Sequence, residues 1–339
     1  MTAQWSTTVA VVIPILNEAR SLGRTLDALT KQDYPRHLVE ILIVDGGSTD
    51  DWQTIARQFQ STDLALRCLP NPGRTAAAAV NLALRETDAK TILWISGHCL
   101  LSPQYLSAAV AEYEKYPGAV VGGRLEVVGH GVASTLYSLV LRSRFGTGAA
   151  PFRFHTDPGP AVSVTYALFE RALLQSVGGV DEQLIRNQDS EIFARLRKIG
   201  TPIRRINATA TYLAPSQLRG IWRRAWGNGA WNIWALRLGK GGVSWWHLMP
   251  MAAVGLAIAL LILSIWSSMA LNVLIVLAGL YLLLALGVAL MEANPGQAWT
   301  IPVLPVLFFV HHAVYGLGSW QALLREIPSP LEVRPLEHN

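Results

Sequence analysis

Short apolar runs alternate with segments of helical periodicity through the first 130 residues of the chain. Four of these runs have the length of a strand and end in polar or turn residues: 9–15, 41–44, 64–69 and 91–95. Asn17 is placed to cap a helix that carries Leu22, Leu26 and Leu29, and a second helix is expected over 75–84. Alternating strands and helices are typical of α/β proteins, so we expect a doubly wound, mostly parallel sheet with helices on both faces.

Polar residues follow the carboxyl ends of these predicted strands. The segments 14–18, 45–47, 71–74 and 96–98 supply acids, amides, glycines and one arginine. In an open parallel sheet, ligands bind outside the carboxyl ends of the strands. The sequence carries no Gly-x-Gly-x-x-Gly turn after the first strand and no P-loop, which argues against a Rossmann dehydrogenase or a P-loop NTPase. The pattern therefore indicates a nucleotide-type site of another kind.

A different pattern covers the C-terminal third, where long apolar runs replace the alternation. Between 245 and 324 the only Asp, Glu, Lys or Arg is Glu292, and three uncharged runs lie at 245–266, 269–291 and 300–324. Each is long enough to cross a bilayer core of roughly 30 Å as a helix. Buried core helices are the alternative, which two adjacent runs of this length disfavour. The third run contains prolines and histidines, so it is compatible with a span, a re-entrant segment or an interfacial helix.

Charge is distributed unevenly along the chain, whose formal net charge is +5. Residues 1–200 hold 19 basic and 19 acidic side chains, whereas 201–244 hold seven basic ones and no acid. A basic block directly before a membrane run is expected to face the cytoplasm and anionic headgroups. Because the N-terminus shows no signal-peptide pattern, we expect an integral protein of the cytoplasmic membrane whose N-terminal domain stays in the cytoplasm. Membrane lipids are therefore predicted partners, and nucleic acid is not.

These patterns divide the chain into four predicted parts. They are an α/β domain at 1–215, a basic and aromatic interface segment at 216–244, a membrane domain of two to three helices at 245–324, and a tail at 325–339. The interface segment mixes Trp with Arg, a combination that suits a membrane surface. The two cysteines, Cys68 and Cys99, indicate neither a disulfide framework nor a metal site by their spacing.

Four motifs follow one another through the first two-thirds of the chain: VVIPILNEARSLGRTLDAL, ILIVDGGSTDD, NPGRTAAAAVNLAL and VGGVDEQLIRNQDSEIFARLRKIG. Together they resemble family-2 glycosyltransferases of the GT-A fold, over residues 9 to about 234. The segments RNQDSEIFARLRKIG, QLRGIWRRAWGNGAWN and HHAVYGLG are similar to the membrane-attached branch of succinoglycan-type exopolysaccharide glucosyltransferases. The resemblance implies an inverting transfer from a nucleotide-sugar donor to a lipid-linked or polysaccharide acceptor. Two alternatives stay open: a polyprenyl-phosphate glycosyltransferase, and a non-catalytic subunit that binds nucleotide sugar in a synthase complex.

The resemblance places the donor site at the strand ends. The residues that it assigns to donor or nucleotide binding are Pro14, Asn17, Glu18, Asp45, Arg74, Asn81 and Ser96. Carboxylates suit this role because they accept hydrogen bonds from base N–H groups and ribose hydroxyls. Ordinary structural roles stay open for several of them: helix capping for Asn17, first-turn charge for Glu18 and a turn for Asp45.

The catalytic Glu-Asp pair of the family falls on Gln188 and Asp189 in this sequence. The resemblance implies that Asp189 is the base that deprotonates the acceptor hydroxyl as it attacks the anomeric carbon. Gln188 departs from the family's Glu, so one acid of the pair is missing. The alternative is that Asp189 and Glu191 are first-turn acids that stabilise a helix dipole.

Ser96-Gly97-His98 stands where the family carries an Asp-x-Asp motif that holds a divalent cation, Mn²⁺ or Mg²⁺, against the donor diphosphate. The resemblance implies that His98 keeps one ligand position while Ser96 gives up the charge. Imidazole is a softer ligand than carboxylate, so we expect a weak metal site that prefers Mn²⁺. The alternative is that His98 only hydrogen-bonds the diphosphate or packs beside Cys99.

Overall fold

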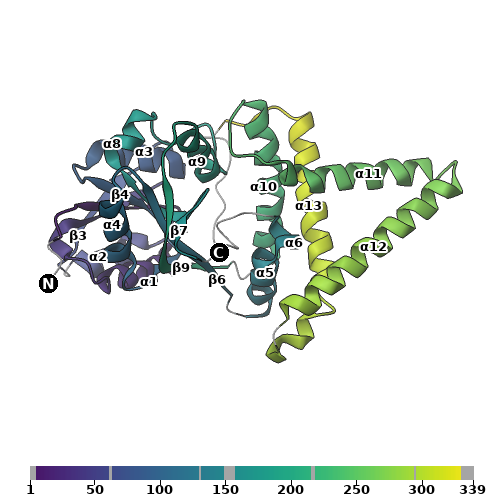
Figure 1. Cartoon of the computed structure of the whole chain (residues 1–339), viewed down its shortest axis with the longest axis horizontal. Coiled ribbons are helices and arrows are strands. Elements are labelled where there is room, and N and C mark those ends of the chain that lie inside the picture. Colours follow the sequence, from purple (N-terminus) through teal and green to yellow (C-terminus); the bar gives the residue numbers. More distant parts are fainter. Residues whose placement is uncertain are drawn as a thin grey trace. The chain divides into compact units, whose positions relative to one another are not determined.

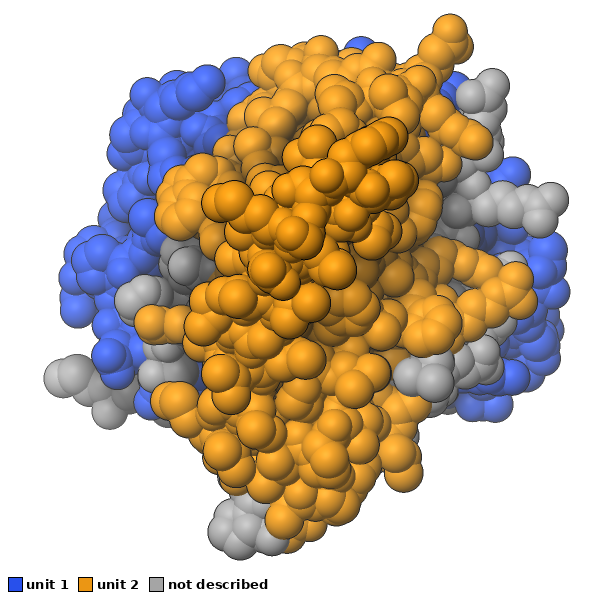
Figure 2. All heavy atoms as spheres, turned by 90° about the vertical axis from the view of Figure 1, so that its right-hand side faces the viewer, with its two compact units in different colours: residues 1–127, 151–213, 328–338 blue, residues 128–150, 214–327, 339 orange. Residues whose placement is uncertain are grey.

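The computed structural model describes residues 5–60, 63–129, 131–148, 157–214, 218–293 and 295–329. The chain forms two compact units, which Figure 2 colours separately. Unit 1 consists mainly of 1–127 and 151–213, and unit 2 mainly of 128–150 and 214–327. The predicted boundary at 215 lies outside the described residues. The division also differs from the prediction in that 128–150 groups with the C-terminal helices rather than with the α/β part.

Unit 1 is built on one mixed sheet, of nine strands in the part of the chain that the structure describes (Figure 1). The strands are β1 (Val9–Ile15), β2 (Val39–Asp45), β3 (Ala65–Pro70), β4 (Thr91–Trp94), β5 (Cys99–Leu101), β6 (Val120–Val128), β7 (Gly159–Pro160), β8 (Thr165–Glu170) and β9 (Ile203–Leu213). Their order is β3-β2-β1-β4-β8-β6-β9-β5, and β7 pairs with β9.

The first half of this sheet is parallel, as the sequence predicts. β1 pairs in parallel with both β2 and β4, and β2 pairs in parallel with β3. The other half is antiparallel, since β8 pairs with β4 and β6, and β9 pairs with β5 and β7. Along β9, buried positions largely alternate with less buried ones, which is typical of an antiparallel strand. The α/β class is therefore confirmed, and the predicted parallel pairing is found among β1–β4.

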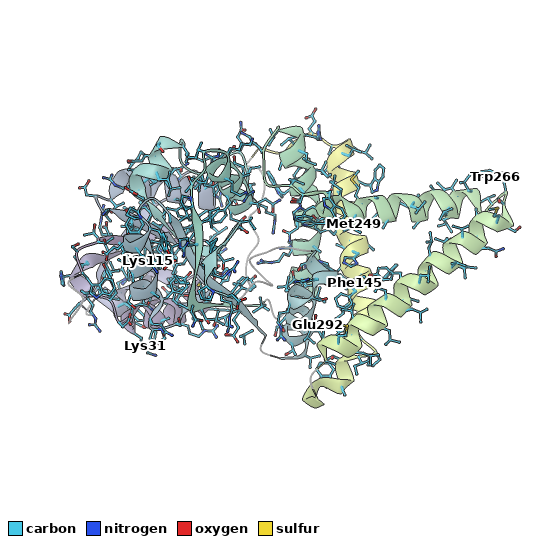
Figure 3. The ribbon with its side chains drawn as sticks, viewed as in Figure 1. Lys31, Lys115, Phe145, Met249, Trp266 and Glu292 are labelled. Carbon is cyan, nitrogen blue, oxygen red and sulfur yellow. The ribbon has the colours of Figure 1, made fainter. Side chains whose placement is uncertain are left out.

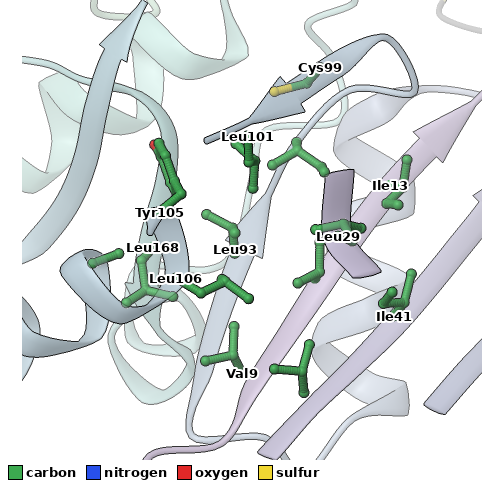
Figure 4. Close-up of a cluster of buried hydrophobic side chains, with 14 of the residues drawn as sticks. Val9, Ile13, Leu29, Ile41, Leu93, Cys99, Leu101, Tyr105, Leu106 and Leu168 are labelled. Carbon is green, nitrogen blue, oxygen red and sulfur yellow. The ribbon is translucent and has the colours of Figure 1, made fainter. Parts of the chain in front are cut away.

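Helices accompany the sheet of unit 1. They are α1 (Ala19–Thr30), α2 (Trp52–Gln60), α3 (Ala76–Glu86), α4 (Tyr105–Lys115), α8 (Arg171–Ser176) and α9 (Gln188–Lys198), with a short 3-10 turn η1 (Arg36–Leu38). Successive residues of β1 enter two separate cores: Val9 and Ile13 belong to the same core as Leu29 and Tyr105 (Figure 4), whereas Ala10 belongs to the core on the other face. Burial on both faces explains why β1 reads as an unbroken apolar run.

Unit 2 is helical in the residues that the structure describes. Its elements are α5 (Val132–Arg142), α6 (Arg144–Thr147), α10 (Leu218–Arg237), η2 (Trp245–Leu248), α11 (Met249–Leu263), α12 (Ser268–Glu292), η3 (Pro295–Thr300) and α13 (Leu304–Leu324). α10 and α13 lie side by side (Figure 1), and neither Gly229 nor Gly318 leaves room for a Cβ at their contact. Small residues allow helix backbones to approach closely. The Trp226 indole adds a hydrogen bond to Gln321 Oε1, at 2.7 Å.

α11 and α12 leave most of their apolar side chains exposed. Among the described residues, two helical segments are long and apolar enough to cross a membrane, Trp245–Leu263 and Ser268–Glu292. None of the first and only 11% of the second is buried, so neither resembles the core helix of a soluble protein. Figure 3 shows their side chains projecting outward from Met249 past Trp266. Contiguous exposed apolar surface of this extent marks contact with a membrane or a partner.

The third predicted run is different. It forms α13, which packs on α10, α11 and α12 and buries Phe308, His311 and Tyr315, among others, within unit 2. α13 is not one of the two segments that are apolar and long enough to span. Its histidines are used in packing: His312 Nδ1 lies 2.9 Å from the Tyr281 hydroxyl, and His312 Nε2 lies 2.9 Å from the Phe145 carbonyl oxygen. The run is therefore the central helix of unit 2.

Candidate active site

The carboxyl ends of β1, β2 and β4 meet at one edge of the sheet. Ile15, the last residue of β1, pairs with Asp45, the last residue of β2. Pro14 precedes Ile15 in the same register and is partly buried, and β4 flanks β1 on the other side. Beyond the strands, Gly46 N donates to Ile15 O at 2.9 Å. The parallel half of the sheet thus positions the first predicted binding residues.

Two glycines allow the loops beyond these strands to approach one another. A Cβ on Gly46 would lie 3.1 Å from the carbonyl oxygen of Arg74, and a Cβ on Gly97 would lie 3.1 Å from Glu18 Cγ. Both distances are tighter than most real Cβ contacts, so a side chain at either position would force its neighbours to move. The four polar segments at the strand ends are therefore brought together, as the sequence predicts.

Asn17 ties the loop after β1 to the loop after β2. Its N donates to Ser48 Oγ at 2.8 Å, and its side-chain oxygen accepts from Thr49 N at 2.8 Å. The prediction that Asn17 caps the first helix is wrong. α1 begins at Ala19, so its N-cap residue is Glu18, whose side chain makes no capping hydrogen bond. Instead Ala19 N donates to Asp50 Oδ2 at 2.7 Å, so an acid from the next loop satisfies the helix terminus.

Asp45 combines a turn role with a site position. Its Oδ1 accepts a hydrogen bond from Ser48 N at 2.9 Å, which holds the turn after β2. Burial and the nearby Asp45 carboxylate raise the pKa of the Cys68 thiol, in that order of importance. The turn bond occupies one carboxylate oxygen, so a base or ribose hydroxyl can still be met by the other.

Glu18 and His98 form a buried pair across the loops after β1 and β4. His98 Nδ1 lies 2.8 Å from Glu18 Oε1, and Ser21 Oγ donates to Glu18 Oε2 at 2.5 Å. Glu18 is 5% exposed and His98 is 9% exposed. The Tyr212 ring meets the imidazole edge-on, with the ring centroids 5.2 Å apart. Both oxygens of Glu18 are thus engaged by side chains of the protein itself.

Ser96 faces a tyrosine that the sequence did not reveal. Ser96 Oγ lies 3.2 Å from the Tyr166 hydroxyl, and the Tyr166 carbonyl oxygen accepts from Tyr105 at 2.8 Å. Burial raises the pKa of Tyr166 well above its usual range, so this hydroxyl is neutral at physiological pH. Position 96 therefore offers a hydroxyl rather than the charge that the family's acid would bring.

Left-handed backbone gathers around this edge. Among the described residues other than glycine, φ is positive at Asn17 (56°), Arg74 (57°), Tyr166 (47°) and Asn187 (64°). Asn17 and Arg74 lie in the loops beyond the strand ends, Tyr166 contacts Ser96, and Asn187 precedes the helix that carries Asp189. Such conformations cost energy and cluster at functional sites. The residues with positive φ thus lie in the region where the sequence motifs place the donor site and the base.

Asn81 holds a loop with its side-chain amide. Its Nδ2 donates to Val180 O at 2.8 Å and to Glu182 Oε1 at 2.7 Å, and its Oδ1 accepts from Val180 N at 2.8 Å. A Cβ on Gly179 would overlap the same amide oxygen. These bonds fix the loop that leads to α9. Donor binding by Asn81 stays a prediction, and its observed bonds are structural.

A partly buried ion pair also holds this loop. Glu191 is 4% exposed, and its carboxylate accepts hydrogen bonds from Nε and Nη2 of Arg195, at 2.7 and 2.8 Å. Arg195 also donates to the carbonyl oxygens of Val177 and Gly179, at 2.6 and 2.9 Å. Two-pronged contacts of this kind restrict geometry strongly. Glu191 therefore anchors the loop before the predicted base, beyond any effect on a helix dipole.

Asp189 itself is exposed in the first turn of α9, and its Oδ1 accepts from Ser190 N at 2.8 Å. Gln188, where the family has an acid, is buried and donates to Ile185 O at 2.6 Å. The residue that departs from the family motif thus has a structural role, while Asp189 presents its carboxylate outward. Its role as the base stays a prediction that this position permits.

The fit of a divalent cation depends on His98. Among the described residues, no group of three or more His, Cys, Asp or Glu side chains is arranged to hold a metal. A histidine that ligates a metal usually places its other ring nitrogen against a carboxylate, and His98 Nδ1 meets Glu18 in this way. The residues therefore suit a cation whose remaining ligands come from a donor diphosphate and water, and not a site preformed by the protein.

Comparison with known proteins identifies the domain. Residues 10–178 match the family described as "Glycosyl transferase family 2". The chain thus carries a family-2 glycosyltransferase domain and is a glycosyltransferase. It is 27% identical over 327 residues to the succinoglycan biosynthesis protein ExoA of Rhizobium meliloti, covering 94% of this chain and 96% of ExoA. It is 20% identical to a dolichyl N-acetyl-α-D-glucosaminyl phosphate glycosyltransferase of Methanococcus voltae, covering 94% and 97%.

Solved structures confirm the GT-A fold. A mannosyltransferase from Pyrobaculum calidifontis, in complex with GDP-Man and Mn²⁺, aligns with a TM-score of 0.58 at 22% identity, over 93% of this chain and 88% of that one. GalNAc-T7 in complex with UDP, GalNAc and Mn²⁺ aligns with a TM-score of 0.50 at 16% identity, over 62% of this chain and 44% of that one. At these identities the likeness concerns the fold.

Proposed function

We propose that this glycosyltransferase moves a sugar, with inversion, from a nucleotide-sugar donor to a lipid-linked or polysaccharide acceptor at the cytoplasmic face of the plasma membrane. The observation that carries the proposal is the union, in one chain, of a family-2 domain with two helices whose apolar side chains stay exposed. A transferase anchored in this way meets water-soluble donors on one side and membrane-bound acceptors on the other.

The choice of acceptor rests on relatives that match over nearly the whole chain. ExoA is named for succinoglycan biosynthesis, and the Methanococcus voltae enzyme is named for a sugar acceptor carried on dolichyl phosphate. Both matches extend through the exposed apolar helices as well as the family-2 domain. Both names concern the building of a glycan, and the second places that glycan on a lipid. We therefore propose a growing glycan held at a membrane as the acceptor class.

In the proposed reaction, donor binding takes place at the strand ends. Asp45 meets the base or ribose, Pro14 and Asn17 line the pocket, and Arg74 meets phosphate, because its guanidinium is permanently charged and forks toward oxyanions. Asp189 then takes the proton from the acceptor hydroxyl as that oxygen attacks the anomeric carbon from the side opposite the leaving diphosphate. Attack from that side inverts the configuration.

We further propose that a divalent cation, with Mn²⁺ preferred to Mg²⁺, assists the donor. When bound, the cation would neutralise charge on the leaving diphosphate. His98 would supply at most one ligand, and imidazole favours the softer Mn²⁺. Turnover is expected to stop in EDTA and to return further with Mn²⁺ than with Mg²⁺. Full turnover in EDTA would remove the cation from the mechanism and leave His98 as a hydrogen-bond donor to the diphosphate.

A polyprenyl phosphate is the second candidate acceptor, and one feature of unit 2 favours it. α10 exposes Trp222 and Trp226 together with Arg219 and Arg223, in a stretch without acids. Trp favours the membrane–water interface, and each Arg near the surface attracts anionic headgroups by about 1 kcal/mol. A lipid phosphate held there would itself act as the nucleophile and would need no base to deprotonate it.

The activity is tested with full-length protein in detergent, supplied with bacterial lipid extract and a panel of UDP-, GDP-, dTDP- and CMP-sugars. Release of free nucleotide is measured with and without the extract. We expect one donor to be consumed, and faster when lipid is present. Release from no donor under any lipid condition would contradict the proposed function and would favour a non-catalytic subunit of a synthase.

A further inference from the structure

We propose that Glu18 is a positioning residue for His98 and does not itself contact the nucleotide. The inference rests on the proposed function, because it concerns how the chain presents His98 to a donor diphosphate. It departs from the role that the motif resemblance implies for Glu18, which is a direct place in the nucleotide pocket. The geometry of this one carboxylate carries the argument.

Glu18 is surrounded by groups of the protein rather than open to a ligand. It is 5% exposed, and its two oxygens accept from His98 Nδ1 and Ser21 Oγ, at 2.8 and 2.5 Å. Its Cβ and Cγ lie so close to Gly97 that a Cβ there would sit 3.2 and 3.1 Å from them. Its burial and these two bonds leave little room for a ligand at this carboxylate, and a buried carboxylate bond is costly to break.

The Glu18–His98 pair decides which ring nitrogen of His98 can meet the nucleotide-sugar donor. A carboxylate can only accept, so Nδ1 carries the proton that points at Glu18. Neutral imidazole then has its lone pair on Nε2, the atom that a divalent cation would use. If the ring is protonated, Nε2–H becomes a donor to diphosphate oxygen. In either state Glu18 fixes Nε2 as the functional atom of His98.

Two further contacts hold the pair in place. The Tyr212 ring lies against the imidazole, with the ring centroids 5.2 Å apart. Thr25 Oγ1 donates to Gly97 O at 2.9 Å, which ties the loop before His98 to α1, the helix that Glu18 precedes. The loop after β4 is thus fixed on α1 through Glu18 and Thr25 together. The buried acid therefore keeps a single imidazole in register where the family's motif would supply two carboxylates.

A double-mutant cycle separates positioning from direct contact. UDP, GDP, dTDP and CMP, the nucleotides of the donor panel, are titrated calorimetrically into full-length protein in detergent with MnCl₂, and the nucleotide that binds is kept. Glu18→Ala, His98→Ala and the double variant are then compared with wild type. Loss of a supporting carboxylate behind a histidine ligand typically costs 10- to 100-fold. We expect each single variant to lose affinity on that order, and the double variant to lose no more than His98→Ala alone.

Two controls keep the result interpretable. Glu18→Gln retains an oxygen for Nδ1–H and an amide that can donate to Ser21 Oγ, so it is expected to recover most of the affinity lost in Glu18→Ala. Asp27→Ala removes an exposed acid from α1 and is expected to bind as wild type does. Thermal unfolding is recorded for each variant, so that a loss of folding is not counted as a loss of binding.

The inference is overturned if the separate losses of Glu18→Ala and His98→Ala multiply in the double variant, since Glu18 would then contact the nucleotide independently. It is equally overturned if Glu18→Gln, while folded, binds no better than Glu18→Ala. Both outcomes leave the proposed function standing, because wild type still binds a nucleotide. If wild type binds none of the four nucleotides, the proposed function fails, and this inference fails with it.

Discussion

The two units of this protein treat apolar side chains in opposite ways. Unit 1 buries them in two cores on either face of its sheet, and the described residues of β1 and β2 are almost fully enclosed. Unit 2 buries apolar side chains along α10 and α13 but leaves those of α11 and α12 uncovered. Since burial of apolar surface drives folding in water, α11 and α12 must find that burial outside the chain.

The same contrast separates the tasks that we propose for the units. In unit 1, polar groups are held by specific hydrogen bonds between loops, as in the Glu18–His98 pair and the clamp of Arg195 on Glu191. In unit 2 the close contacts are between glycine-rich helix faces, as at Gly229 and Gly318. Chemistry requires fixed donors and acceptors, whereas membrane attachment requires only length and apolarity. The comparison therefore predicts that damage to one unit leaves the function of the other intact.

The largest expected effect is on catalysis alone. Asp189→Asn keeps the size of the side chain and removes the base, so transfer should fall on the order of 10²- to 10⁴-fold. Retention in membranes and nucleotide affinity should stay unchanged. Turnover, calorimetric binding and carbonate extraction are measured on the same preparation. If the variant transferred sugar at a near-normal rate, Asp189 would be only a first-turn acid that favours the helix dipole.

The converse variant places a charge on the exposed face of α12. Leu280 and Ile199 are exposed to similar extents, 57% and 60%, but Leu280 lies in unit 2 and Ile199 in unit 1. In water, arginine at either position is tolerated. In a bilayer core, Leu280→Arg should cost roughly 3 kcal/mol and reduce the fraction retained after carbonate extraction, whereas Ile199→Arg should have no effect. Equal retention of both variants, or release of the wild-type protein by carbonate, would remove the membrane from the account.

A smaller effect, on the free energy of unfolding, is expected in the loop of unit 1 that the Asn81 side chain holds. Gly178 and Gly179 both have positive φ, 82° and 73°, yet only Gly179 lies against Asn81. Gly178→Ala should cost about 1 kcal/mol, the usual penalty of left-handed backbone. Gly179→Ala should cost more, because its Cβ would also displace the Asn81 amide from Val180. Chemical unfolding of the two variants measures their loss of stability. Equal losses would show that the contact between Asn81 and this loop contributes nothing to stability.

The smallest expected effect concerns reactivity and not stability. Burial raises the pKa of Cys99 far more than that of Cys68, whose side chain is exposed. A raised pKa keeps the thiol protonated at neutral pH, and the thiolate is the reactive form. A thiol reagent should therefore label Cys68 slowly and Cys99 only after unfolding. Rapid labelling of both in the native protein would mean that the core beneath the Ser96–His98 loop opens readily.

Local patterns predicted much of this fold for identifiable reasons. β1, β2 and β4 were predictable because strands buried on both faces read as short apolar runs between turn residues. α11 and α12 were predictable because their sequences are long, apolar and almost free of charge. The antiparallel strands β6, β8 and β9 were not, since their partly covered faces mix polar and apolar residues.

The candidate site shows the same division. Motif spacing selects Asp45, Arg74 and His98, and the structure places their loops together. Spacing could not show that Asp50 rather than Asn17 serves the start of α1, because that bond joins residues 31 positions apart. Nor could it pair Glu18 with His98, which are 80 positions apart. Hydrogen bonds of this kind depend on the tertiary fold, and no local pattern encodes them.

The central claim is that unit 1 transfers a sugar to an acceptor held in the membrane in which unit 2 is embedded. Its most direct test is mass spectrometry of bacterial lipid extract after incubation with full-length protein, Mn²⁺ and the nucleotide-sugar panel. The account predicts a lipid-linked product heavier by one sugar residue with the wild-type protein, and none with Asp189→Asn. A product of one sugar on polyprenyl phosphate would identify the lipid phosphate itself as the acceptor. Nucleotide release with no glycosylated lipid or polysaccharide, or equal product from Asp189→Asn, would contradict the account.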